Sequence, residues 1–274
     1  MELKEQRLTA ADTAALQPVA NRLSRLIAIT TTNLVHDATF KPVPGKRIET
    51  ATKAKLQDAY ELARQRLLSA DDHLRSILTL LKPDSVLPSF AMFTLVRGAA
   101  VATVHARYLL EPAIDEPTRL GRGLSARLEN LTQQQKVHPD TQGSHFNDRV
   151  EHLRQRAEAN GLTVNRNRNG VITGFGDGWL SDTDLFDKYM PAGVGKTYFQ
   201  YLSGYAHSLP WAQYPMSRAK PSDDPEIVLV PTDVNVPVLA AVLDGELGLY
   251  DETIGFYLGH GGYPALVWAE AKKS

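Results

Sequence analysis

The sequence predicts a mainly α-helical fold: a single multi-helix, bundle-like domain spanning residues 1–274, with a small β-hairpin inserted. Apolar residues recur at intervals of three and four along most of the chain, which is the pattern of helices with one buried face. Prolines and glycines separate these segments. One short segment instead carries β-type residues around an Asn-Gly pair. No internal repeat and no stretch typical of an interdomain linker interrupts the chain, so we expect one domain.

The first helix is predicted to begin after Thr9, a good N-cap residue because its hydroxyl can accept a hydrogen bond from an unpaired backbone amide. The apolar residues that follow keep helical spacing up to Leu34. The loop FKPVPG at residues 40–45 then ends the helix, since proline cannot continue the helical hydrogen-bond ladder.

Four further helices follow, and each ends at or near a proline or glycine. Pro83, Pro112, Pro139 and Gly161 mark these ends. The helix at 86–110 is apolar nearly all round, so we expect it to be the central one. The predicted ranges are 50–81, 86–110, 117–137 and 144–160.

The character of the chain changes at residues 162–178, where Asn169-Gly170 lies between two short β-type runs. Asn-Gly is a strong hairpin signal because both residues tolerate the positive φ of a tight turn. After this hairpin we expect two more helices, a proline-rich surface loop and a final helix. Their predicted ranges are 181–189, 196–207, 209–231 and 236–258.

Composition excludes several classes of protein. The formal net charge is −1, so a nucleic-acid partner would require a local basic patch. The absence of cysteine excludes disulfides, thiolate metal sites and cysteine nucleophiles. The N-terminal segment lacks the apolar core of a signal peptide, and Arg97, His105 and Arg107 interrupt the longest apolar stretch. We therefore expect a soluble cytoplasmic protein that does not enter a membrane.

Two glycine-rich segments fall short of nucleotide-binding motifs, and we expect no cofactor. Residues 193–197 end like a phosphate-binding loop, but Met190 stands where its first glycine is required. Residues 174–178 lack the strand–helix–strand unit of a dinucleotide site. Both segments are better explained as turns.

Three side chains on the helix at 144–160 could bind a metal ion. His145, Asp148 and His152 are offset by three and seven residues, so they share one helix face. Imidazole and carboxylate together suit zinc, iron or nickel. A solvated polar face would explain the same three residues, because this helix is polar all round.

Arg97 stands in the apolar helix at 86–110, and a buried charge requires a partner. An internal ion pair is the simpler explanation and a bound anion the alternative, while His105 fits a hydrogen-bonded core histidine. The later segment YFQYLSGYAHS places Ser203 and His207 one turn apart. Such a pair on one helix rarely reaches the geometry of nucleophilic catalysis. Polar-tipped aromatics in and after this segment suit a binding cleft; they are Tyr198, Tyr201, Tyr205 and Trp211.

Together, LVRGAAVATVHARYLLEP at 95–112 and YFQYLSGYAHS at 198–208 resemble uncharacterised bacterial helical proteins related to the HEPN superfamily, over about residues 86–212. The resemblance implies a helical bundle, often dimeric, and in many members a metal-independent ribonuclease that uses an arginine, polar residues and a histidine. His207 would be the histidine, with Ser203 beside it. No arginine stands at the expected positions 200–202, so Arg97 would have to supply the positive charge. This departure favours a relative without catalytic activity or one with a divergent site.

Three hypotheses follow. The first is a binding or scaffold protein of HEPN-like type, dimeric through an apolar helix face, with RNA or protein as its partner and a link to defence or stress. The second is a ribonuclease that uses His207 as acid or base and Arg97 as phosphate clamp. The third is a metal enzyme built on His145, Asp148 and His152.

Overall fold

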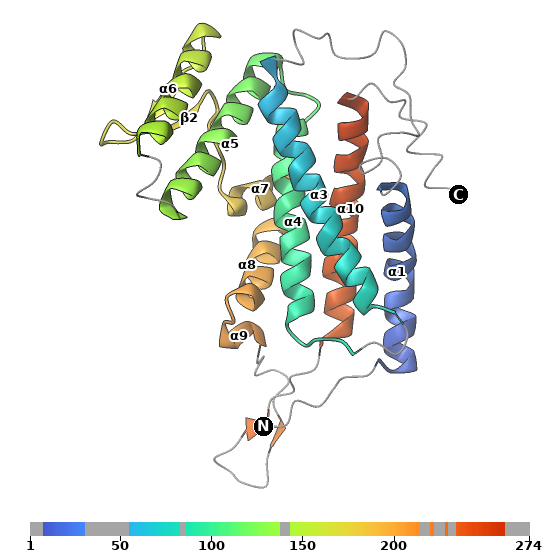
Figure 1. The fold of residues 1–274 in the computed structure, drawn as a ribbon. Helices are drawn as coiled ribbons and strands as arrows, with labels where there is room; N and C mark the ends of the chain where they lie inside the picture. Colours follow the sequence, from blue (N-terminus) through green and yellow to red (C-terminus); the bar gives the residue numbers. More distant parts are fainter. Residues whose placement is uncertain are drawn as a thin grey trace.

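The protein was analysed as a computed structural model, which describes residues 8–30, 55–82, 86–137, 143–213, 220–221, 228–229 and 234–260. Four long helices lie side by side and form the main bundle (Figure 1). Their bounds are α1 Ala10–Thr30, α3 Gln57–Leu80, α4 Ala91–Leu110 and α10 Val236–His260. The mainly helical prediction is therefore confirmed. No helix within these described ranges is long and apolar enough to cross a membrane.

Helix α4 is the central helix, as predicted. It packs against α3, α10, α7 and α8, and its buried residues lie on all sides. Gly98 leaves room for the imidazole of His73 on α3, because a Cβ atom there would lie 2.4 Å from Nε2 of His73. The helix begins at Ala91, five residues later than the start predicted at 86, and Pro88 precedes it. Proline disfavours the α conformation in the residue before it, which keeps Leu87 out of the helix.

The C-terminus of α4 is capped by two buried arginines of α5, which spans Glu116–Val137. Arg119 donates to the carbonyl oxygens of Leu109 and Glu111 at 2.6 and 2.8 Å. Arg122 donates to the carbonyl of Tyr108 at 2.8 Å and to the carboxylate of Glu111 at 2.6 Å. Carbonyls at a helix C-terminus have no partner within the helix, so the guanidinium groups satisfy them, and the carboxylate of Glu111 also compensates the charge of Arg122.

A second, smaller hydrophobic core lies between α5, α6 (Gly143–Ala159) and the hairpin formed by β1 (Val164–Arg166) and β2 (Ile172–Phe175). These elements lie to one side of the bundle, and α1 lies on the opposite side (Figure 1). The buried members of this core are Leu56, Leu120, Leu124, Leu128, Leu131, Leu153, Ala157 and Phe175.

The hairpin predicted at residues 162–178 is confirmed. Its turn is held by the side chain of Asn167, whose Oδ1 accepts from the amides of Asn169 and Val171 at 3.0 and 3.1 Å. Gly170 has a φ of 76°, which a side chain would disfavour. The hairpin is fixed to α5 by Ser125, whose hydroxyl accepts from the amide of Phe175 at 2.8 Å and lies 3.2 Å from the carbonyl of the same residue.

The chain then forms α7 (Asp182–Tyr189) and α8 (Gly195–Ala206), both close to their predicted ranges. Most of the surface loop predicted at 209–231 lies outside the described residues, and the described parts differ from the prediction at two places. Pro210–Gln213 form the short helix α9, and β3 (Lys220–Pro221) pairs with β4 (Val228–Leu229). Proline fits the first turn of a helix, and a ladder of two residues leaves no periodic pattern, so neither element stands out in the sequence.

Candidate functional site

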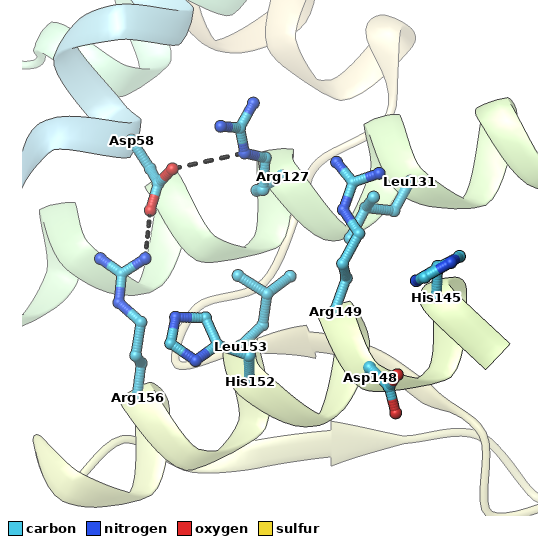
Figure 2. Close-up of a pocket in the computed structure, with 9 residues that line it drawn as sticks. All are labelled: Asp58, Arg127, Leu131, His145, Asp148, Arg149, His152, Leu153 and Arg156. Atoms are coloured by element: carbon cyan, nitrogen blue, oxygen red, sulfur yellow. Dashed lines mark hydrogen bonds and ion pairs between the residues drawn. The ribbon is translucent and has the colours of Figure 1, made fainter. Parts of the chain in front are cut away.

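A cleft of about 430 Å³ lies between α5 and α6, beside the first turn of α3 (Figure 2). We call it the arginine cleft, because three arginines line it. Its lining residues are Asp58 of α3, Arg127 and Leu131 of α5, and His145, Asp148, Arg149, His152, Leu153 and Arg156 of α6.

The local sequence of α6 explains this arrangement. Leu153 is buried in the second core and holds α6 against α5. Arg149 and Arg156 are seven residues apart, which is close to two helical turns, so they project from the same face. The cleft therefore lies at the solvent-exposed edge of the contact between α5 and α6, next to Leu153.

The charges in the cleft are only partly compensated. Asp58 accepts from Nη1 of Arg156 at 2.5 Å and lies 3.4 Å from Nε of Arg127. Arg149 is exposed, and its one contact among the described residues is long, 3.4 Å from its Nη1 to Oε1 of Gln134. Three arginines and two aspartates thus line the cleft. One of the aspartates, Asp148, points away from the arginines (Figure 2). Such a lining attracts anions.

The predicted metal residues all line this cleft, but they do not form a metal site. The carboxylate of Asp148 points away from α5, whereas His145 and His152 project on the same side as Arg149 (Figure 2). Within the described ranges, no three His, Asp or Glu side chains are placed to hold a metal ion. Three neighbouring guanidinium groups would also repel a cation. The structure gives the metal hypothesis no support.

Of the predicted catalytic residues, Arg97 and Ser203 are brought together. Nε of Arg97 donates to Oγ of Ser203 at 3.2 Å, and its guanidinium lies 5.6 Å from the ring centre of Phe199. His207 is the exposed C-cap residue of α8, and its backbone amide donates to the carbonyl of Ser203 at 2.9 Å. No hydrogen bond of the His207 imidazole is seen within the described ranges.

Asp182 is a charged neighbour of Arg97 that sequence reasoning missed. It accepts from Nε2 of His105 at 2.7 Å. This bond lowers the pKa of Asp182, against the opposing effect of burial, and the charges of His105, Arg97 and Arg66 lower it further. Among the described residues, Nδ1 of His105 is buried without a hydrogen-bond partner. His105 is thus the hydrogen-bonded core histidine that the sequence predicted.

The aromatic binding cleft predicted on α8 is corrected in part. Tyr198 and Tyr205 are each 7% exposed and belong to the main core. The hydroxyl of Tyr198 donates to the carbonyl of Val242 at 2.6 Å, and Tyr205 stacks on Phe93 with ring centres 4.1 Å apart. Tyr201 is half-buried, and only Trp211 is largely exposed, at 55%. Helical spacing did not distinguish polar-tipped core residues from a binding surface.

Comparison of the chain with protein-family models, with curated proteins and with solved structures finds no match.

Proposed function

We propose that this protein is a non-catalytic binding protein that holds phosphate groups of RNA in the arginine cleft. The observation that carries the proposal is the convergence of three arginines from two helices on one concave surface. Guanidinium groups bind phosphate oxygens through paired, charge-assisted hydrogen bonds. The formal net charge is −1, so the chain as a whole does not attract phosphate, and a local group of arginines is required to do so.

The arginines keep donors for a ligand. Among the described residues, Arg127 forms its ion pair through Nε, so its terminal amino groups remain for another acceptor. The contact of Arg149 at 3.4 Å is long for a hydrogen bond and is easily exchanged. Arg156 is the most firmly held of the three, because its Nη1 forms a 2.5 Å ion pair with Asp58. Arg149 should therefore contribute most to binding.

The test is fluorescence anisotropy with single-stranded RNA labelled at its 3′ end. Arg149→Gln should raise Kd about tenfold, the loss of one charge-assisted contact. Arg154→Gln is the matched control, because Arg154 lies on the same helix but pairs with Glu151 and Glu158 outside the cleft. It should change Kd less than about twofold. Equal effects of the two variants, or no binding by the unchanged protein, would refute the proposal.

RNA cleavage of the HEPN type is the second candidate, favoured by the contact of Arg97 with Ser203 one turn before His207. His207→Ala should then abolish cleavage while leaving the thermal melt unchanged, since His207 is exposed. Undiminished cleavage by this variant would remove the candidate. Kinship with HEPN-related bacterial proteins, a homodimer, a cytoplasmic location and a role in defence or stress remain part of the proposal and rest on the sequence.

A further inference from the structure

The cleft-facing side of α6 carries a straight row of alternating imidazole and guanidinium groups. His145, Arg149, His152 and Arg156 all line the arginine cleft. At about 100° per residue, these four positions fall within an arc of about 60° of the helix circumference. At about 1.5 Å per residue, the row is about 16 Å long. We call these four residues the α6 row.

Resting on the proposed function, we propose that the α6 row binds a single strand of RNA lying along the helix. In this arrangement the two arginines hold backbone phosphates and the two histidines stack on bases. Single-strand-binding proteins combine these same two elements, a positively charged groove and flat rings on which successive bases stack. A row of this length suits the shortest sites of such proteins, about four nucleotides.

The position of the rings supports this assignment. His145 and His152 are exposed, and both project from α6 on the side of Arg149 (Figure 2). Histidine is one of the side chains on which unstacked RNA bases lie. Leu131 and Leu153 also line the cleft, but both are buried, so the exposed rings are those of the two histidines. The cleft thus offers partners for both halves of a nucleotide.

The shape of the cleft favours a single strand over a duplex. Its volume of about 430 Å³ is that of a site for a small molecule, set between two packed helices. The bases of an A-form duplex are stacked inside the helix, so a duplex could offer the rim its phosphates, 2′-hydroxyls and base edges but no free base face. It would leave both histidine rings without a base on which to stack.

The experiment measures Kd and its salt dependence for a single-stranded RNA of eight nucleotides and for the same sequence as a duplex. The unchanged protein should bind the single strand at least tenfold more tightly. Arg149→Gln should weaken binding and reduce the slope of log Kd against log salt by about 0.7, the value for one phosphate contact on a single strand. His152→Ala should weaken binding at least fivefold and leave the slope unchanged, because stacking releases no counterions. Arg154→Gln should change neither quantity.

The outcomes separate the two proposals. Equal affinity for the single strand and the duplex, or a reduced salt slope for His152→Ala, would overturn the proposal that the α6 row is a single-strand site. If Arg149→Gln still lost binding in that case, the proposed function would stand. No binding of either RNA would overturn both. Circular dichroism of each variant checks that the helix content is unchanged, which is the expected result because Arg149 and His152 are exposed.

Discussion

Glu246 is a buried carboxyl group in the main bundle, and replacing it by glutamine should change how stability depends on pH. It lies on α10 with 0% exposure. Burial raises the pKa of Glu246 to about 8, although the hydrogen bond with Thr103 opposes this shift. The group is therefore neutral in the folded protein at pH 7, and glutamine is close to it in shape and charge.

Thr103 is the hydrogen-bond partner of Glu246. Oγ1 of Thr103 lies 2.9 Å from the carbonyl oxygen of Ala99 and donates to Oε1 of Glu246 at 2.6 Å. The carbonyl-type oxygen of a neutral carboxyl accepts such a bond, and so does the amide oxygen of glutamine. The Glu246→Gln variant can therefore keep this contact.

The magnitude follows from linkage between proton binding and folding. The unfolded chain loses this proton near the ordinary pKa of 4.5, and the folded chain loses it near 8. Between these values the folded state binds more protons, so stability falls by about 1.4 kcal/mol per pH unit as pH rises. Over about 3.5 units the loss is on the order of 5 kcal/mol, and it ends above pH 8.

The assay is urea unfolding of the unchanged protein and of Glu246→Gln at pH 5, 6, 7 and 8. The two should differ little at pH 5, and the variant should be the more stable by several kcal/mol at pH 8. Other titrating groups are common to both proteins and cancel in the difference. Glu252→Gln on the same helix is the control, because the side chain of Glu252 is 55% exposed. A constant difference between Glu246→Gln and the unchanged protein over this range would refute the reasoning.

Three further predictions concern stability. Burial opposes ionisation of Glu111, but hydrogen bonds from Lys188 and Arg122 prevail and lower its pKa to about 2. Glu111→Gln should therefore lower the free energy of unfolding at pH 7 by about 1–2 kcal/mol after solvent screening. Urea unfolding should show that the difference between variant and unchanged protein vanishes as pH falls from about 4.5 to 2. A Cβ atom at Gly195 would lie 2.0 Å from the carbonyl oxygen of Phe186, so Gly195→Ala should lower the melting temperature by several degrees. Gly259→Ala is its control, since no described atom lies within 4 Å of a Cβ there, and equal melting temperatures would contradict the prediction. Ser125→Ala removes the acceptor for the Phe175 amide and should cost about 1–2 kcal/mol in urea unfolding; an unchanged midpoint would show that the hairpin does not depend on it.

The helices could be predicted because each boundary is a local signal. The range predicted for α5, 117–137, differs from Glu116–Val137 by one residue, since a proline opens the helix. The Asn-Gly turn was equally local. The pairing of β3 with β4 was not, because two paired residues leave no pattern to detect.

The site could be predicted only in part, because its members come from three helices. The shared helix face of His145 and His152 was correctly expected, and both line the cleft. The expected ligand chemistry paired them with Asp148, whereas Arg149 projects on their side (Figure 2). Arg127 and Asp58 each resemble an ordinary charged residue on a solvated helix face. Only tertiary packing brings them to the cleft.

The division of the apolar interior into two cores has a consequence for exchange of backbone amides with solvent. Tyr60 is packed against both cores, and the smaller core holds α6 and the hairpin. A small core can open while the large one stays closed, since cooperative units of a protein unfold with different free energies. Backbone amides of α6 should therefore exchange with solvent before those of α4. A ligand that bridges α5 and α6 should slow exchange of the α6 amides and leave that of the α4 amides unchanged. The exchange rates of α6 would then show that the cleft is occupied even when the ligand is unidentified.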